Sequence, residues 1–471
     1  MMLNKDRFFP ADPVTRSIAQ RLFKEVTHLP LLCVHGHTDP AWFSGNQNFT
    51  DPAQLLIVPD HYILRMLVSQ GVDHAALGVK PIDGTPAEGD GRKIWRLFVE
   101  NYHLFRSTPV RHWMDYTLEQ QFGFDAPLPS LDADDSFDRI SGALASDAFK
   151  PRALFDKFNI GVLATTDSCL DDLAHHRIIS HSDWGGHVVP TYRPDSVTNP
   201  DLAGFQDAIA RLGALTGEDT TTWKGLLRAH KKRRRDFIAH GATATDHGHP
   251  SATTSDLSKA ECQALYADIL RGKAGKRKKE AFRGQMLTEM ARMSIDDGLV
   301  MQVHVGSMRN HSRFVFEKYG PDQGFDIPAR TDFVSALKPL LDIMGHDPRL
   351  TIILFTLDET TYGRELAPLA GAYPCLRLGP AWWFFDSPDG MLRYRGITTE
   401  IAGYYNTVGF NDDTRAFPSI PARHDLARRI DCSFLANQVA EHRIGEDEAA
   451  EVAVDLAYGL ALKSYKYGHL S

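Results

Sequence analysis

The sequence predicts an α/β protein built on a (β/α)8 barrel, a closed ring of eight parallel strands with helices around it. Short apolar runs recur along the chain, and helical patterns separate them, which is typical of parallel βα units. Eight such runs can be found, and their C-terminal ends carry His, Asp, Arg or Trp. The active site of such a barrel gathers at those ends, so the polar residues stand where a site would form.

The composition is that of an ordinary globular protein, because 43% of the 471 residues are hydrophobic and 24% are charged. That length suits one elaborated barrel, and we expect 1–471 to form a single catalytic unit. The formal net charge, 52 − 60 = −8, is modest, and no charged tail favours nucleic acid or membrane as a partner. The basic runs at 231–235 and 275–279 are interpreted as solvated helix faces rather than nucleic-acid contacts.

The cysteines and the N-terminus indicate the compartment. Five cysteines are spread along the chain without a CxxC pair, which favours reduced thiols over a disulfide framework. The first residues lack the apolar core of a signal peptide, and no uncharged apolar run is long enough to cross a bilayer. We therefore expect a soluble, cytoplasmic protein.

The first element is a helix that precedes the barrel. Asp12 can cap it and Pro13 suits its first turn, and Pro30 follows as a stop signal. One apolar face is formed by Ile18, Leu22, Phe23 and Val26. The eight candidate strands then follow at 31–37, 160–167, 187–195, 241–248, 299–306, 351–359, 375–383 and 406–413. The small residues of 241–248 fit a loop as well as a strand.

The connections between these runs are uneven. About 120 residues separate the first run from the second, which is too many for a simple crossover. They include helix-like stretches at 61–72 and 93–105, so we predict a mostly helical insertion at about 41–157 over the mouth of the barrel. The last element predicted is an amphipathic helix over 445–465.

The sharpest local feature is the sequence His35-Gly36-His37 at the end of the first run. Alternate residues of a strand point the same way, so both imidazoles can face one ion. Two neutral nitrogens suit a divalent metal such as zinc. The alternative is a pair of ordinary hydrogen-bonded histidines.

Further polar residues would converge on the same mouth. Asp412 and Asp413 end the eighth run and His304 ends the fifth, and an Asp beside a metal can be a ligand or a proton acceptor. Arg309 and Arg415 follow those ends, and guanidinium groups favour carboxylates. The alternatives are a core histidine and surface salt bridges. The pair Trp382-Trp383 ends the seventh run, where a ligand platform and core packing are both open.

The chain resembles the uronate isomerase family in a series of short motifs. They are HGHTDP, PDHYILRML, LATTD, YRPD, TDHG, MQVHVGSMRN, GPDQGFD, AWWFFDSPDGM, GFNDDTRAF and ARHDLARR. They occur in the order of that family and span from about residue 35 to residue 429, and their ordered combination is very specific. The resemblance implies a distorted TIM barrel of the metal-dependent amidohydrolase type. It also implies the interconversion of D-glucuronate with D-fructuronate and of D-galacturonate with D-tagaturonate.

The resemblance also implies roles for individual residues. The metal-binding positions of the family correspond to His35, His37 and Asp413, to which the barrel geometry adds His304. Family positions for a tyrosine and two arginines correspond to Tyr62, Arg309 and Arg415, with His61 beside the tyrosine. Departures from the family pattern are TTDSC for TTDDP, GPAWW for GSGWW and DDTR for TDSR. Asp413 and Arg415 keep their spacing, so these changes bear on substrate preference more than on the reaction.

The mechanism we expect is proton transfer between C1 and C2 of the open-chain uronic acid through a cis-enediol. Asp413 and Tyr62 would share the acid–base work, and Arg415 would stabilise the developing negative charge. The substrate carboxylate and hydroxyls would be bound by Arg309, His61 and Arg193, with Trp382 packed on the sugar. One divalent cation is expected; zinc is preferred, although the same ligands accept manganese, iron or cobalt.

Two other functions are weighed against the isomerase. A hydrolase of the same superfamily with two metals usually carries a lysine at the fourth strand and a histidine at the sixth. The runs at 241–248 and 351–359 have neither, which favours one weakly held metal and an isomerase. A barrel that has lost activity and serves as a scaffold is disfavoured, because every residue needed for turnover is present. As a large metabolic enzyme, the protein is expected to form a homo-oligomer.

Overall fold

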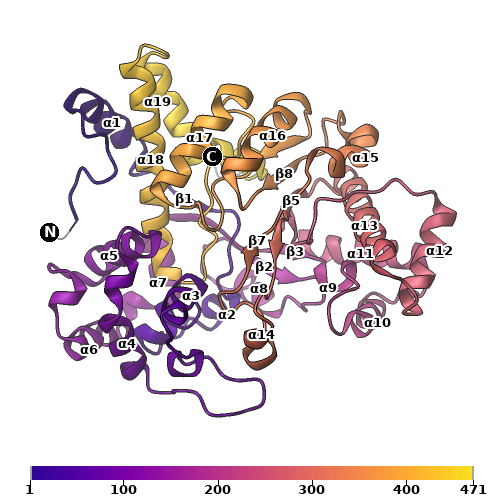
Figure 1. The fold of residues 1–471 in the computed structure, drawn as a ribbon, viewed down its shortest axis with the longest axis horizontal. Helices are drawn as coiled ribbons and strands as arrows, with labels where there is room; N and C mark the ends of the chain where they lie inside the picture. The colour runs from indigo at the N-terminus through magenta and orange to yellow at the C-terminus, as the bar shows by residue number, and fades with distance from the viewer. Residues whose placement is uncertain (1–2, 469–471) are drawn as a thin grey trace.

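A parallel sheet of seven strands, curled into most of a barrel, organises the computed structural model, which describes residues 3–468 (Figure 1). The strands, in their order across the sheet, are β1 (Leu31–Cys33), β2 (Ile160–Ser168), β3 (Val188–Arg193), β4 (Ala244–His247), β5 (Val300–His304), β8 (Ile352–Phe355) and β9 (Leu376–Leu378). All neighbouring strands pair in parallel. The α/β barrel predicted from the sequence is confirmed, and each strand lies within or overlaps a predicted run.

The eighth predicted strand, 406–413, is the main difference. It forms only an isolated bridge between Thr407 and Leu378 of β9, so it is no regular strand. Gly409 has a φ of +78°, and a Cβ there would lie 2.8 Å from the carbonyl oxygen of Leu456, so the backbone turns away from β9. The segment still completes the ring, because the His37 amide donates to the Thr414 carbonyl at 3.0 Å.

Helices cover the outside of the sheet, and the strands are therefore buried on both faces; every residue of β4 and β5 is buried. These helices are α8 (Ala174–Ser180), α9 (Asp195–Thr198), α10 (Phe205–Thr216), α11 (Trp223–Ala239), α12 (Lys259–Leu270), α13 (Lys276–Asp297), α15 (Val334–Met344), α16 (Glu359–Ala372), α17 (Pro388–Ala402) and α18 (Ile420–Ala440). Within residues 3–468 no helix is both long and apolar enough to cross a bilayer.

The first helix and the last helices of the described residues pack together on α18. Helix α1 (Pro13–Val26) begins where predicted, with Asp12 accepting a hydrogen bond from the Thr15 amide. The C-terminal elements are η6 (Phe417–Ser419), which precedes α18, and then α19 (Glu446–Val454), η7 (Asp455–Gly459) and α20 (Leu460–Ser464). Ile18 and Leu22 of α1 join one apolar cluster with Leu435 and Val452.

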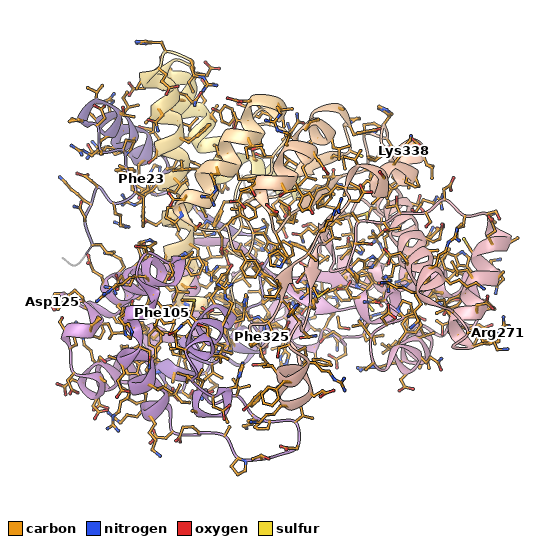
Figure 2. All side chains as sticks on the ribbon, viewed as in Figure 1. Phe23, Phe105, Asp125, Arg271, Phe325 and Lys338 are labelled. Carbon is orange, nitrogen blue, oxygen red and sulfur yellow. The ribbon has the colours of Figure 1, made fainter. Side chains whose placement is uncertain are left out.

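The regular elements of the connection between β1 and β2 are all helices, and it lies at the lower left in Figure 1. It contains α2 (Pro40–Gly45), η1 (Ala53–Ile57), α3 (His61–Ser69), η2 (His74–Leu77), α4 (Gly91–Glu100), η3 (Tyr102–Phe105), α5 (Pro109–Phe122), η4 (Leu128–Ser130), α6 (Ala133–Leu144), η5 (Asp147–Phe149) and α7 (Pro151–Lys157). Its side chains fill its interior, where Phe105 is fully buried (Figure 2). The same apolar cluster includes Val300 and Phe355 of the barrel.

A short segment after β5 reaches across the barrel mouth. It consists of β6 (Ser307–Met308), α14 (Arg313–Tyr319) and β7 (Ile327–Pro328), and β6 pairs with β7 in antiparallel fashion. The loop at 320–326 packs on the insertion: a Cβ at Gly324 would lie 3.1 Å from the backbone of His61 and Arg65. Sequence patterns did not predict this hairpin, whose two strands are only two residues long.

Candidate active site

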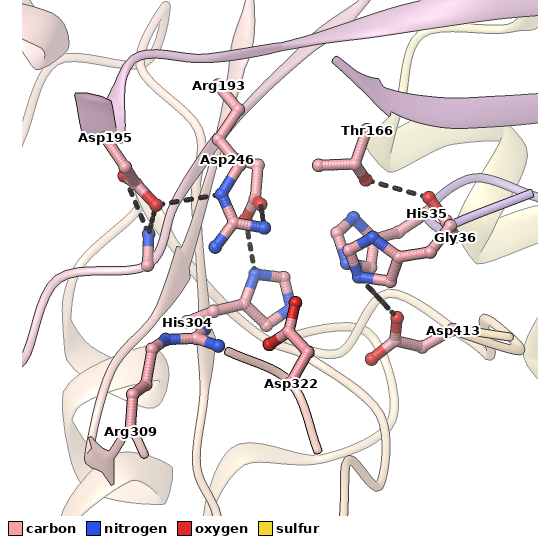
Figure 3. A network of polar contacts seen from close by, with 12 residues as sticks. His35, Gly36, Thr166, Arg193, Asp195, Asp246, His304, Arg309, Asp322 and Asp413 are labelled. Carbon is pink, nitrogen blue, oxygen red and sulfur yellow. Dashed lines mark hydrogen bonds and ion pairs between the residues drawn. The ribbon is translucent and has the colours of Figure 1, made fainter. Parts of the chain in front are cut away.

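The two histidines that follow β1 face one carboxylate. Nε2 of His37 lies 3.2 Å and Nε2 of His35 lies 3.6 Å from Oδ1 of Asp413. The Thr166 hydroxyl donates to the carbonyl of Gly36 at 2.8 Å and holds the turn between the histidines (Figure 3). Burial lowers the pKa of His37 against the opposing effect of Asp413, which favours a neutral imidazole.

Asp413 lies at the point where the irregular eighth segment ends. Its φ of +39° is unusual for a residue with a side chain and turns the carboxylate toward the histidines. Oδ2 accepts a hydrogen bond from the Trp382 indole at 2.8 Å. Burial alone would raise the pKa of Asp413, but His37, His35 and His304 outweigh it and lower the pKa well below its usual value. Asp413 is therefore an anion at neutral pH.

His304 joins this group from the end of β5. Nδ1 of His304 lies 2.6 Å from Oδ1 of Asp246, which fixes the ring (Figure 3). The ring stacks on Phe355 and His35. Burial lowers the pKa of His304 to about 4 against the opposing effect of Asp246. Phe355 is the last residue of β8, the sixth strand of the barrel sheet, where the sequence lacks the histidine of a two-metal site.

These side chains could hold a metal ion. Donor atoms of His35, His37 and Asp413 lie within 4.8 Å of one another, and so do those of His35, Asp246 and His304. Nε2 of His304 is buried and has no hydrogen-bond partner, and the buried Oδ1 of Asp413 has none besides its ion-pair contacts with His35 and His37. Buried polar atoms rarely lack a partner, so converging nitrogen and oxygen donors of this kind fit a divalent cation. A third group, Cys33, Asp412 and His424, lies behind the site.

Three arginines surround the site, each beside a carboxylate. Nη1 of Arg309 donates to Oδ2 of Asp326 at 3.1 Å, and Nη2 of Arg415 donates to Oδ2 of Asp322 at 3.2 Å. About a third of each of these two arginine side chains is exposed to solvent. Arg193 is held more firmly, because Asp195 at 2.8 Å and Asp246 at 3.3 Å both contact it.

The insertion supplies His61 and Tyr62 at the start of α3. Asp60 caps this helix by accepting hydrogen bonds from the amides of Tyr62 and Ile63, which fixes the first turn at the mouth. A small cavity is lined by His37, His61, Tyr62, Asp413 and Arg415 among others, so two of these residues come from α3 and two from the end of the eighth segment and the loop after it. Burial and the positive charge of Arg415 lower the pKa of His61 to about 3.

The predicted site residues lie around one mouth. For Trp382 the sequence left both a ligand platform and core packing open, and in the structure it contacts Asp413. It bonds Asp413 directly and is 3% exposed, next to Trp383, on which Arg309 is stacked with its Cζ 5.6 Å from the ring centre. Four neighbouring residues were missed from the sequence: Asp246, Asp322, Asp386 and Arg423. All four lie in motifs that resemble the family, which was the available signal.

Comparisons with known proteins agree on one family. A family model described as glucuronate isomerase matches residues 4–465. A protein of Rhizobium meliloti (strain 1021) named uronate isomerase is 58% identical over 465 residues, 99% of each chain. The crystal structure of glucuronate isomerase from Caulobacter crescentus superposes with a TM-score of 0.97 at 55% identity, covering 99% of this chain and 97% of that one. The crystal structure of uronate isomerase from Thermotoga maritima gives 0.92 at 25% identity, covering 99% and 100%.

These matches extend over nearly the whole chain, and the named relatives are isomerases. They therefore support the isomerase and not the hydrolase alternative. The chain belongs to the glucuronate isomerase family.

Proposed function

We propose that this protein isomerises D-glucuronate to D-fructuronate and D-galacturonate to D-tagaturonate by proton transfer through a cis-enediol. The observation that carries the proposal is the approach of one buried, ionised carboxylate, that of Asp413, to His35 and His37 in the mouth that Tyr62 and Arg415 also line. An ionised carboxylate beside cationic and polar groups can accept a carbon-bound proton and return it to the neighbouring carbon.

Each residue of the mouth has a part in the reaction. Asp413 takes the proton from C2 and delivers a proton to C1, and Tyr62 transfers protons to and from the two oxygens. Arg415 stabilises the negative charge that develops on the enediolate. The carboxylate of the substrate is bound by Arg309, with His61 and Arg193 contacting hydroxyls. Trp382 both orients Asp413 and packs beside the sugar.

The cation is proposed to be zinc, held by His35, His37, Asp413 and His304. Imidazole nitrogens with one carboxylate are ligands that zinc accepts. When bound, a divalent cation polarises adjacent carbonyl and hydroxyl oxygens of the substrate. Chelation is expected to lower both the activity and the melting temperature, and metal analysis of the purified protein identifies the ion.

The cysteines support a location in the cytoplasm. All five are buried and form no disulfide, which fits a reducing compartment.

The oligomeric state is proposed from a second observation. Exposed apolar side chains gather on the segment across the mouth, where Met308 is 54%, Phe314 69% and Phe316 44% exposed. Such exposure supports a homo-oligomer. Light scattering after gel filtration tests it, and a monomer at micromolar concentration would contradict it.

The experiment for the function is a substrate panel. Purified protein is incubated with D-glucuronate, D-galacturonate, D-glucose and an N-acyl sugar, and products are followed by NMR. We expect ketoses from the two uronates and no reaction with glucose, which lacks the carboxylate. Hydrolysis of the N-acyl sugar without isomerisation of either uronate would contradict the proposal.

A further inference from the structure

The hydroxyl of Tyr62 is already bonded to a second carboxylate. It donates to Oδ1 of Asp386 at 2.8 Å and accepts a hydrogen bond from the amide of Phe384 at 3.2 Å. Phe384 has a φ of +72°, an unusual conformation that aims its amide at this oxygen. Burial and the negative charge of Asp386 raise the pKa of Tyr62 well above its usual value. Tyr62 is therefore a neutral phenol that does not act as a base by ionising.

Asp386 is held in place by a buried cation. Nη1 of Arg423 lies 3.5 Å from Oδ2 of Asp386 and donates to the carbonyl of Asp412 at 3.2 Å. The guanidinium stacks on Trp113, with Cζ 3.6 Å from the ring centre. Both charged side chains are at least 89% buried. A buried charge pair of this kind costs desolvation energy, so its presence beside a reacting group invites a functional explanation.

Asp386 is also suited to gain and lose a proton. Burial raises its pKa to about 6 against the opposing charge of Arg423 and the hydrogen bond from Tyr62, while Asp413 raises it further. These three groups come from α18, from α3 and from the eighth segment. A group whose pKa lies near the working pH is suited to accept a proton and to give it back.

The two residues lie in neighbouring cavities. Tyr62 lines the cavity that contains His37, His61 and Arg415, whereas Asp386 lines an adjoining one with Trp382 and Asn411. Asp413 lines both. A substrate over Asp413 and Arg415 would thus meet the Tyr62 hydroxyl, with Asp386 behind it.

We propose that Asp386 is the proton acceptor behind Tyr62, an inference that rests on the proposed isomerase function. As the C2 hydroxyl of the enediolate gives its proton to the Tyr62 oxygen, the Tyr62 proton passes to Oδ1 of Asp386. The reverse transfer then delivers a proton to the C1 oxygen. Each O–H bond that breaks is matched by one that forms, and Asp386 ends as the carboxylate it was. Asp386 acts through Tyr62 and is a positioning residue.

A double-mutant cycle tests the relay. Asp386→Asn keeps the shape of the side chain but removes the acceptor for a transferred proton, so we expect kcat to fall about 10- to 100-fold with KM nearly unchanged. In the Tyr62→Phe background the same substitution is expected to cause no further loss, because no proton reaches Asp386. Asp386→Ser gives the same comparison if the asparagine variant is unstable.

Asp431→Asn is the matched control. Asp431 pairs with Arg395 at 2.7 Å at a similar depth on α18, so its loss removes a comparable ion pair without touching Tyr62. It is expected to lower the melting temperature and leave kcat unchanged. Equal proportional losses for Asp386→Asn in both backgrounds would overturn the relay, as would an unchanged kcat in the single variant. Wild-type activity distinguishes the two proposals. If the wild-type protein does not isomerise uronates, the proposed function itself is overturned.

Discussion

Asp413 is the proposed base for the carbon-bound proton, and its carboxylate contacts both histidines and Trp382. The substitution Asp413→Asn removes the negative charge and changes little in volume. We expect kcat to fall by at least about 10²-fold, because the base for the carbon-bound proton is lost. Circular dichroism checks that the variant is folded. A folded Asp413→Asn protein with normal turnover would contradict the assignment of Asp413 as the base.

Arg309 is expected to contribute binding rather than chemistry. Arg309→Met keeps an apolar stem but removes the guanidinium that lies over Trp383, so the side chain can no longer bind a carboxylate. KM for glucuronate is expected to rise about 10-fold or more with a smaller change in kcat. Arg313→Met, at a side chain 88% exposed on α14, is the control and should leave both constants as they are. An unchanged KM in the Arg309 variant would exclude the residue from the substrate site.

At this scale the sequence predicted the residues that stand in recognisable motifs at strand ends. His35, His37 and His304 follow β1 or end β5, where the barrel rule places them. The partners that fix them were not predictable from spacing. Asp246 contacts His304 across 58 positions and Asp386 contacts Tyr62 across 324, because tertiary packing brings them together.

Among the elements, the loop at 320–326 couples the segment across the mouth to α3. Gly324 has a φ of +85°, and a Cβ there would lie 3.1 Å from the backbone of His61 and Arg65. Gly324→Ala is therefore expected to push the loop away from α3, raise KM several-fold and lower the melting temperature. Steady-state kinetics and thermal unfolding measure both effects.

Gly84→Ala separates the effect of backbone strain at a positive φ from the effect of the Cβ contact with α3. Gly84 has a similar φ of +79°, but its Cβ would meet nothing within 4 Å. It carries the same backbone strain without the contact, so it should lower stability modestly and leave KM unchanged. Equal effects on KM from both alanine variants would contradict a role for the Gly324 contact.

A helix or strand could be predicted from the sequence where the signals that form it are local. Helix α1 was predicted correctly because its cap and its apolar face are local signals. The eighth strand was predicted wrongly, because NTVGFNDD carries the apolar pattern of a strand while Gly409 bends against Leu456 of a distant helix. The hairpin β6–β7 is too short to show any periodicity.

For the molecule as a whole, buried histidines make stability depend on pH. Burial lowers the pKa of His230 and of His247 to about 3, against 6.5 for the ordinary side chain. Below pH 6.5 the unfolded chain binds protons that the folded protein does not, so the free energy of unfolding falls as pH falls toward 3. One such histidine contributes roughly 1.4 kcal/mol per pH unit in that range.

His230→Asn checks this claim. Asparagine can still bond the Tyr192 hydroxyl, which lies 2.7 Å from Nδ1 of His230, but it does not titrate. Urea unfolding at pH 7, 6 and 5 is expected to show a shallower pH dependence in this variant than in the wild type. An identical dependence would contradict the linkage.

The whole fold was more predictable than any of its parts, because eight runs and their polar ends are redundant evidence for one architecture. A missing regular strand left the barrel prediction intact, since seven parallel strands and the bridge at Thr407 still form the ring. The depth of the insertion's contact with the barrel could not be read from the sequence, because the shared cluster of Phe105, Val300 and Phe355 joins distant parts of the chain.

Isomerisation by proton transfer in the mouth around Asp413 is best tested by proton NMR of D-glucuronate in D2O with the purified protein. We expect D-fructuronate to appear with deuterium at C1 and recovered D-glucuronate to carry deuterium at C2, because the transferred proton exchanges with solvent. A folded, metal-loaded protein that yields no ketose from D-glucuronate or D-galacturonate would contradict it.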